Sequence, residues 1–269
     1  MDLSKIKLVV SDMDGTLLNS KNEVSREFFE LFKKLKEHNI HFAAASGRQY
    51  FSIVDKLNPI KNDISIIAEN GGITKSGELE LGSAFLSNES VGEVISSLRK
   101  LDKTEMVLCG KNRAYVESQN ERFLNFFTNF YKSYQRVDNL MTVDDDICKV
   151  ACYYPYDSEE YIQEALKDLA EEIHWKISGE YWIDIAHRDS HKGNAVHQLQ
   201  EHLKVSPEET LVFGDYENDL EMMQQAGLSI AMENAHPSIL KIAHHRTKSN
   251  DDLGVETILQ ELIQQRKVF

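Results

Sequence analysis

The sequence has few cysteines and no long apolar run. Its three cysteines, Cys109, Cys148 and Cys152, are an odd and sparse set, so we expect reduced thiols and a cytoplasmic protein rather than a disulfide framework. No stretch of about 18 apolar residues occurs, which argues against a transmembrane helix. The first residues, MDLSKIKLVV, lack a basic start followed by a long apolar segment, and we therefore predict no secretory signal.

Positive charge is also scarce. The chain has 30 Lys and Arg residues against 44 Asp and Glu residues, which gives a formal net charge of −14. So acidic a chain is unsuited to nucleic acid or to an anionic membrane surface, and we expect neither as a partner. A small phosphorylated metabolite remains compatible, because a local positive site can outweigh the sign of the whole chain.

Several enzyme signatures are absent as well. The sequence has no phosphate-binding P-loop, no G-x-S-x-G elbow of a serine hydrolase, and no G-x-G-x-x-G segment after a predicted strand. Internal repeats and low-complexity tracts are also absent, and the 41% of apolar residues is enough to build a core. A length of 269 residues is ordinary for a domain that carries a large insertion.

Short apolar strands alternate with amphipathic helices at both ends of the chain. Helices are predicted from apolar residues spaced i, i+3, i+4 and i+7, with Ser25 as the N-cap of the first and Gly227 as a C-cap near the end. This alternation predicts an α/β fold, with a Rossmann-like parallel sheet that has helices on both faces. The buried strands are predicted at residues 6–11, 40–45, 64–68, 210–213 and 228–232.

The middle of the chain has a different pattern. It is richer in aromatic residues and contains the strand-like segments RAYVES, CKVACYY and YWIDIA, with helices predicted near 91–101 and 159–172. The aromatic run FLNFFTNFYKSY is interpreted as the core of a helix, since aromatic side chains are usually buried. We therefore predict an inserted α+β domain at 82–186, and a core domain made of 1–81 and 187–269.

Two aspartates end the first predicted strand, in the segment KLVVSDMDGTLL. Asp12 and Asp14 lie two residues apart, so on an extended backbone their side chains point the same way. Neighbouring carboxylates in a cleft repel each other unless a cation lies between them or one of them holds a proton. Mg²⁺ suits such a pair, because it takes few carboxylates and commonly bridges to a substrate phosphate. The alternative is a pair of ordinary loop carboxylates.

Ser46 and Asp215 end two further predicted strands, and the chain contains four motifs in a fixed order. DMDGTLL resembles the first motif of the haloacid dehalogenase-like (HAD) phosphohydrolases, ASGR at 45–48 resembles the second, Lys192 in SHKGNAV the third, and GDYENDLEMM at 214–223 the fourth. The large insertion between the second and third motifs resembles the Cof-type subfamily with a C2-type (type IIB) cap. The resemblance covers essentially the whole chain, and it is specific in the core and only architectural in the cap.

The resemblance implies a phosphatase that works through an aspartyl-phosphate. Asp12 would be the nucleophile, and Asp14 would protonate the leaving oxygen and then deprotonate the hydrolytic water. Mg²⁺ would be held by Asp12, by the backbone carbonyl of Asp14 and by Asp215, and would offset the repulsion between the nucleophile and the phosphate. Asp219 would hold the metal ligands in place without touching the metal.

The resemblance also implies a set of phosphate contacts. They would come from the Ser46 hydroxyl, the backbone of Met13 and Gly47, and the side chain of Asn218, while Lys192 would act both as a phosphate ligand and as a catalytic cation. Lys192 is notable on its own, since a cation in the first turn of a helix costs about 0.3–1 kcal/mol against the macrodipole, and a bound phosphate reverses that sign. The alternative is a solvated lysine at a helix start.

Ser46 and Asp184 are among the positions that depart from the family pattern. Ser46 stands where threonine is frequent and keeps the hydroxyl donor, and Asp184 stands where glutamate is common. His187, Arg188 and His191 lie shortly before the lysine motif and have the chemistry to contact a substrate. A solvated polar linker is nevertheless the preferred interpretation of these three residues, because linkers are usually surface segments.

The sequence thus predicts a Mg²⁺-dependent phosphatase for small phosphomonoesters, with sugar phosphates as the preferred substrate class and nucleotide or cofactor phosphates behind them. A phosphotransferase or phosphomutase is an alternative, since the same core residues serve both reactions. A module that binds phosphorylated ligands without turnover is the other alternative, although every charged group that the chemistry needs is present. We expect a monomer or a small homo-oligomer.

Overall fold

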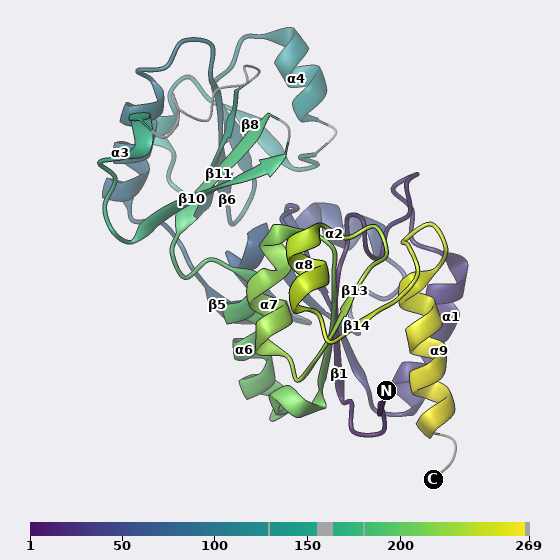
Figure 1. Cartoon of the computed structure of the whole chain (residues 1–269). Coiled ribbons are helices and arrows are strands. Elements are labelled where there is room, and N and C mark those ends of the chain that lie inside the picture. The colour runs from purple at the N-terminus through teal and green to yellow at the C-terminus, as the bar shows by residue number, and fades with distance from the viewer. Residues whose placement is uncertain (129, 155–163, 180, 267–269) are drawn as a thin grey trace.

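The computed structural model describes residues 1–128, 130–154, 164–179 and 181–266. Within these ranges the chain forms two β-sheets, each with its own helices (Figure 1). No helix among the described residues is long and apolar enough to cross a bilayer.

The first sheet is built from both ends of the chain. Its strand order is β14-β13-β12-β1-β2-β3-β4-β5, and neighbours run parallel from β14 to β3, whereas β4 and β5 form an antiparallel edge. The strands are β1 (Leu8–Asp12), β2 (His41–Ala45), β3 (Ser65–Ala68), β4 (Ile73–Ser76), β5 (Leu79–Ser83), β12 (Thr210–Gly214), β13 (Leu228–Ala231) and β14 (His245–Arg246).

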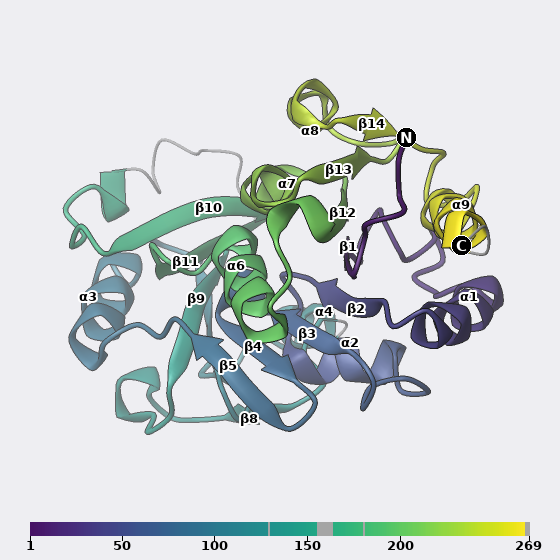
Figure 2. The same ribbon diagram turned by 90° about the horizontal axis from the view of Figure 1, so that it is seen from below.

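Helices cover both faces of this sheet. Helix α1 lies beside α9 on one face, and α6 lies beside α7 on the other (Figure 1, Figure 2). This arrangement confirms the predicted α/β fold class. The helices and 3₁₀ turns of this part are α1 (Arg26–Glu37), α2 (Tyr50–Lys56), η1 (Glu69–Gly71), α6 (Lys192–Leu203), η3 (Pro207–Glu209), η4 (Glu217–Asp219), α7 (Leu220–Gln225), α8 (Pro237–Ile242) and α9 (Gly254–Arg266).

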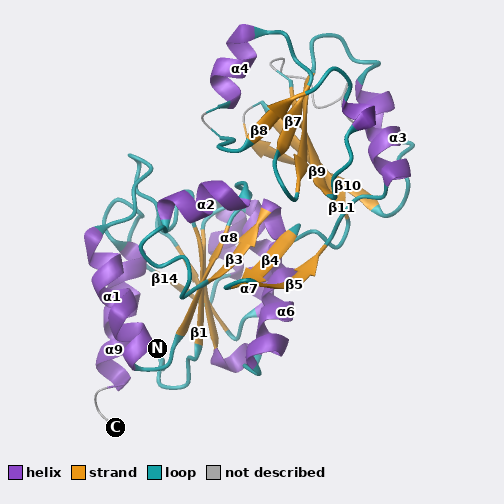
Figure 3. Ribbon diagram, turned by 180° about the vertical axis from the view of Figure 1, so that it is seen from behind, coloured by secondary structure: helices purple, strands orange, loops and turns teal. Residues whose placement is uncertain are grey.

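The second sheet is contiguous in the sequence, and its strand order is β10-β11-β9-β6-β7-β8. Figure 3 shows this sheet from behind, with α3 and α4 beside it. Apolar side chains of α3 pack on one face of this sheet, and those of α4 pack on the other. Its elements are α3 (Asn88–Leu98), β6 (Glu105–Gly110), β7 (Ala114–Val116), α4 (Glu121–Phe127), β8 (Tyr134–Arg136), η2 (Leu140–Thr142), β9 (Ile147–Tyr153), β10 (Ile173–Gly179) and β11 (Trp182–His187).

The chain passes from one sheet to the other near the predicted domain limits. Strand β5 of the first sheet ends at Ser83, and β11 of the second sheet ends at His187. The limits at 81/82 and 186/187 remain a prediction. Of the helix predicted at 159–172, the first residues fall within 155–163 and lie outside the described residues.

Two local predictions are wrong. Gly227 is not a left-handed C-cap, because α7 ends in an extended residue, Ala226, and Gly227 has no positive φ. A glycine is needed there because a Cβ would lie 2.7 Å from the Cα of Glu208. The aromatic run is not one buried helix either, since α4 ends at Phe127 and Phe130 beyond it is 41% exposed.

Helix α1 begins as the sequence predicts. The Ser25 hydroxyl accepts a hydrogen bond from the backbone N–H of Phe28 at 2.9 Å and donates one to Glu256 of α9 at 2.6 Å. The Ser25→Ala variant is expected to lose about 1–2 kcal/mol of unfolding free energy, because a cap and a largely buried hydrogen bond disappear together. Urea unfolding followed by circular dichroism measures this. Ser4→Ala, which removes only a surface bond to Asp2, is the control, and equal losses in both variants would contradict the prediction.

Candidate active site

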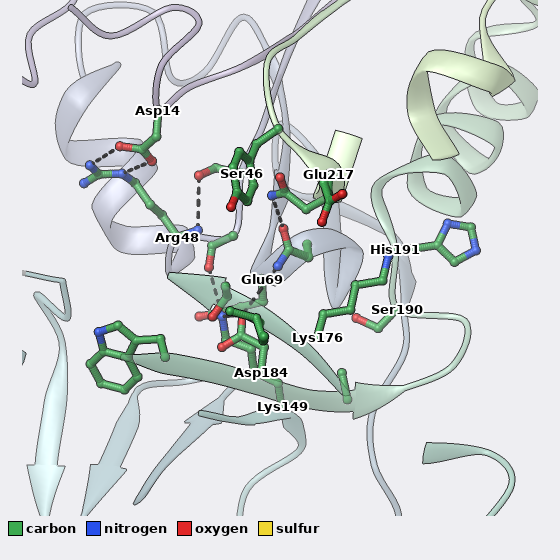
Figure 4. A pocket seen from close by; sticks show the side chains of 18 of the residues that line it. Asp14, Ser46, Arg48, Glu69, Lys149, Lys176, Asp184, Ser190, His191 and Glu217 are labelled. Atoms are coloured by element: carbon green, nitrogen blue, oxygen red, sulfur yellow. Dashed lines mark hydrogen bonds and ion pairs between the residues drawn. The ribbon is translucent and has the colours of Figure 1, made fainter. Parts of the chain in front are cut away.

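The four sequence motifs meet at one edge of the first sheet. Asp12 ends β1, Ser46 follows β2 and Asp215 follows β12, and these three strands are neighbours. Parallel strands bring their carboxyl ends to the same edge, where ligands of α/β folds bind. All three residues line a cavity of about 760 Å³, whose opposite wall comes from the second sheet (Figure 4).

A buried acidic cluster lies at this edge. Carboxylate oxygens of Asp12, Asp215 and Asp219 lie within 4.8 Å of one another. Lys192, the first residue of α6, is fully buried, and its Nζ donates to Asp12 Oδ1 at 2.5 Å and to Asp219 Oδ1 at 2.6 Å. The alternative of a solvated lysine at position 192 is therefore wrong.

The protein engages both oxygens of Asp219. Besides the Lys192 contact on Oδ1, Oδ2 accepts hydrogen bonds from the backbone N–H groups of Asp215 at 2.9 Å and of Tyr216 at 3.2 Å. A carboxylate used in this way orients its neighbours. The geometry suits the supporting role that the sequence predicts for Asp219.

The cluster contains more negative charge than its lysine balances. Burial raises the pKa of Asp12 well above its usual value, with further increases from Asp219, Asp215 and Asp14, although Lys192 acts in the opposite direction. Burial and the charge of Asp219 raise the pKa of Asp215 to about 6. Burial lowers the pKa of Lys192, but Asp12 and Asp219 outweigh that effect, so the pKa of Lys192 is raised and the ammonium stays charged.

This donor set fits a divalent cation. Two buried carboxylates, the partly buried Asp215 carboxylate and one ammonium leave an excess of negative charge, and carboxylate oxygens are ligands that Mg²⁺ prefers. The orientation of the Asp215 carboxylate is fixed by Thr16, whose Oγ1 donates to Asp215 Oδ1 at 2.9 Å. Gly15 adjoins it with φ +75°, and a Cβ there would overlap Asp215 Oδ2. Position 15 therefore requires glycine for both its conformation and the space it leaves.

Without a bound metal, the unfolding free energy is expected to depend on pH because of this excess negative charge. In the folded protein the pKa of Asp215 is raised from an ordinary 3.8 to about 6, so the folded state holds a proton that the unfolded state has already released. The unfolding free energy in EDTA should therefore fall as pH rises through about 4 to 6. Mg²⁺ should stabilise the protein more at about pH 7.5 than at about pH 5. Thermal melts in EDTA and in MgCl₂ at both pH values measure this, and an equal shift at both would contradict it.

The Asp14 carboxylate lies apart from this cluster. Strand β1 ends at Asp12, so the extended geometry that would align the two side chains does not continue to Asp14. Arg48 donates from Nε to Asp14 Oδ2 at 2.7 Å and from Nη2 to Oδ1 at 2.5 Å (Figure 4). Its Nη2 also donates to Asn22 Oδ1 at 2.9 Å. The expectation of one cation between the two side chains is corrected: Lys192 pairs with Asp12, and Arg48 pairs with Asp14.

Ser46 and Gly47 form a loop in the lining of the cavity. The backbone N–H of Arg48 donates to Ser46 Oγ at 3.1 Å, so the Ser46 hydroxyl proton can be given to another acceptor. Asn70 packs against this loop, since its N–H donates to the Ser46 carbonyl at 3.0 Å. A Cβ on Gly47 would lie 3.1 Å from the Asn70 amide. Both predicted loop residues are thus placed where a phosphate in the cavity could reach them.

Asn218 and Met13 complete the predicted set. Asn218 lines the cavity, and its Nδ2 donates to Asn70 Oδ1 at 3.0 Å. Met13 is absent from the described residues of the lining; its side chain is fully buried, and its carbonyl accepts from the N–H groups of Thr16 and Leu18. Any contact of Met13 with a phosphate would therefore come from its N–H group.

Residues of the second sheet and of the following segment reach the same cavity. Phe130, Trp182 and Lys176 line it. His191 lines it too, and its Nδ1 accepts from the Asn194 N–H at 3.1 Å as the N-cap of α6. The interpretation of this segment as a solvated linker is therefore wrong for His191.

Some charged residues of the cavity had no role in the sequence-based prediction. Arg48 is one, although it stands inside the ASGR motif. Lys149 is another; its Nζ lies 2.8 Å from Asp184 and 3.0 Å from Glu69, and its side chain is 5% exposed. A lysine within the otherwise apolar segment CKVACYY is the signal that could have revealed it, because a buried lysine needs partners.

Known proteins resemble this chain in both sequence and fold. A family model described as haloacid dehalogenase-like hydrolase matches residues 9–259. The 5-amino-6-(5-phospho-D-ribitylamino)uracil phosphatase YbjI of Escherichia coli (strain K12) is 32% identical over 267 residues, which are 98% of each chain. SMU.1108c from Streptococcus mutans UA159 has a solved structure with a TM-score of 0.89 and 26% identity, covering 96% of this chain and 99% of its own.

A HAD subclass IIB sugar phosphatase has the same fold, with a TM-score of 0.82 at 20% identity and coverage of 95% of this chain and 98% of its own. The family match includes both sheets and all four motifs. The chain therefore belongs to the haloacid dehalogenase-like hydrolase family, and it is a phosphatase of that family.

Proposed function

We propose that the protein is a Mg²⁺-dependent phosphatase that hydrolyses small phosphomonoesters through an aspartyl-phosphate on Asp12. The position of Asp12 carries this proposal. It ends a central strand in the lining of the cavity, pairs with the buried Lys192, and lies beside the Asp215 carboxylate. A phosphoryl-accepting nucleophile needs a fixed carboxylate in its ionised form, and Lys192 together with a bound cation would favour that form against the effect of burial.

The reaction is assigned as two displacements at phosphorus. Lys192 holds Oδ1 of Asp12, which leaves Oδ2 to form the new oxygen–phosphorus bond. As the bond to the leaving oxygen breaks, Asp14 gives that oxygen a proton. A water molecule then attacks the phosphorus and gives a proton to Asp14, so inorganic phosphate leaves and the Asp12 carboxylate is restored.

The phosphate and the metal have separate holders in this proposal. Mg²⁺ would be held by Asp12, Asp215 and the carbonyl of Asp14, and it would neutralise charge on the nucleophile and on the phosphate. The phosphate oxygens would be bound by the set predicted from the sequence, namely the Ser46 hydroxyl, the N–H groups of Met13 and Gly47, and the side chains of Asn218 and Lys192.

We propose sugar phosphates and related polyol phosphates as the substrate class. A cavity of about 760 Å³ holds a small organic group in addition to the phosphate. By its name, the E. coli relative acts on a phosphate carried by a ribityl chain, and the subclass IIB neighbour is named as a sugar phosphatase. A cytoplasmic location and a monomeric or small homo-oligomeric state are part of the same proposal.

The test is release of inorganic phosphate from a panel of sugar phosphates, polyol phosphates, nucleotides, pyridoxal phosphate and an aryl phosphate, in Mg²⁺ and in EDTA. We expect metal-dependent release, fastest with the sugar and polyol esters. Conversion of one ester to an isomer without phosphate release would instead identify a phosphomutase. A bound ester that stays intact would identify a non-catalytic module.

A further inference from the structure

Lys149 links the second sheet to the loop after β2. It lies in β9 and is 4% exposed, and its Nζ donates to the backbone carbonyl of Gly47 at 3.1 Å. The same ammonium pairs with Glu69, which follows β3 in the first sheet, at 3.0 Å, and with Asp184 of β11 in the second sheet at 2.8 Å (Figure 4). One buried cation thus holds three groups that come from both sheets.

The Gly47 carbonyl is part of the hydrogen-bonded path to Ser46. The carbonyl of Gly47 and the N–H of Arg48 belong to one planar peptide group. That N–H donates to Ser46 Oγ at 3.1 Å. A cation on the carbonyl oxygen polarises the peptide group and strengthens its N–H as a donor. Because the Ser46 oxygen accepts the hydrogen bond from the Arg48 N–H, its own proton points to another acceptor. Ser46 lines the cavity, so a phosphate there can be that acceptor.

We propose that Lys149 is a positioning residue for phosphate binding, which fixes the Gly47–Arg48 peptide group and through it the donor direction of the Ser46 hydroxyl. This inference rests on the proposed function, since it concerns how the same site holds phosphate. Lys149 belongs to the second sheet. The position of that sheet over the cavity is therefore coupled to the conformation of the loop at residues 46–48.

A second lysine of the same sheet offers a matched control. Lys111 follows β6, and its Nζ pairs with Glu80 of β5 at 3.0 Å, so it also joins the two sheets. Lys111 is absent from the described lining of the cavity. If Lys149 only fastened one sheet to the other, loss of either lysine should affect phosphate binding alike.

The first experiment measures the dissociation constant of inorganic phosphate by calorimetry in MgCl₂. For Lys149→Met we expect binding about tenfold weaker than for the wild type, and for Lys111→Met a change below about twofold. Equal constants for Lys149→Met and the wild type would overturn the proposal. Equal weakening by both variants would also overturn it, since it would show a fastening role alone.

The second experiment is a double-mutant cycle with Ser46→Ala. If Lys149 acts through the Ser46 hydroxyl, Lys149→Met should weaken phosphate binding by less than about twofold once that hydroxyl is gone. Retention of the full tenfold effect in the Ser46→Ala background would show that Lys149 does not act through Ser46 and would overturn the assignment.

Loss of Lys149 leaves the buried Glu69 and the partly buried Asp184 without their shared cation, so a charge-balanced variant is needed as well. Lys149→Met combined with Glu69→Gln and Asp184→Asn has no ionised group at this position, and circular dichroism checks its fold. We expect the same tenfold weakening, and wild-type affinity would overturn the proposal. The phosphate titrations do not require the protein to turn over a substrate. If no ester released phosphate, the proposed function would be contradicted, and the titrations would still decide the role of Lys149.

Discussion

Asp12→Asn is expected to abolish phosphate release, with kcat lower by at least about 10⁴-fold, because an amide has no anionic oxygen to accept the phosphoryl group. The fold should persist. The asparagine keeps a carbonyl oxygen that can accept the hydrogen bond from Lys192. It also removes one of three neighbouring negative charges, and burial disfavours that charge, as the raised pKa of Asp12 shows. In EDTA the variant should be at least as stable as the wild type.

Phosphate release with Mg²⁺ and thermal melts in EDTA measure the two parts of this prediction. Asp63→Asn is the control, since the Asp63 carboxylate pairs with the exposed Lys36 and is absent from the described lining of the cavity, and full activity is expected. Substantial activity of Asp12→Asn would remove Asp12 from the role of nucleophile. A large drop in melting temperature would instead show that the Asp12 charge stabilises the fold.

Lys192→Met is expected to have the second largest effect, on stability as well as activity. Nζ of Lys192 is the cation that Asp12 and Asp219 share, and the Lys192 and Asp219 side chains have no exposed surface. Removal of one partner from a buried ion pair typically costs about 3–5 kcal/mol, because the remaining charge has neither water nor a counter-ion. In EDTA we expect a loss of that size in unfolding free energy, together with loss of turnover.

Mg²⁺ should restore part of this stability, since a divalent cation supplies the positive charge that the variant lacks. Urea unfolding in EDTA and in MgCl₂ measures both effects. Lys36→Met breaks an exposed pair of similar length and should change the unfolding free energy by less than about 1 kcal/mol. If Lys192→Met costs no more than Lys36→Met in EDTA, the buried cluster does not depend on its lysine.

The parts of the site that lie on regular strands could be predicted from the sequence. Asp12, Ser46 and Asp215 each stand at the carboxyl end of a parallel strand, and the sheet order β12-β1-β2 brings these ends together without any detail of side-chain packing. Lys192 is predicted differently, from the resemblance of its segment at a helix start to the third motif of the family. Its complete burial was not foreseen, because burial depends on the neighbours that η4 and β1 place around it.

Asp14 shows where strand geometry stops being informative. The alignment of Asp12 with Asp14 assumes an extended chain, and the chain turns after Asp12. The side chain of Asp14 then finds Arg48, which is 34 residues away. No period in the sequence marks that pair, since it depends on how two loops approach each other at the sheet edge.

Lys149 was missed for a related reason. Asp184 is in register with Ala151, which places Lys149 diagonally across from it on the neighbouring strand. That relation needs the register of β9 and β11, and the Gly47 contact needs the placement of one sheet against the other. Neither quantity is contained in a local pattern of residues.

The position of β1 between β12 and β2 also has a consequence for biosynthesis. A ribosome makes β1 and β2 early, then all of the strands of the second sheet, and only afterwards β12. At about 5–20 residues per second, the β1 edge that β12 later covers stays unpaired for on the order of ten seconds or more. Exposed strand edges recruit other chains. The second sheet, contiguous in the sequence, is complete before that edge closes, so a nascent chain has the wall of its cavity before it has Lys192 and Asp215.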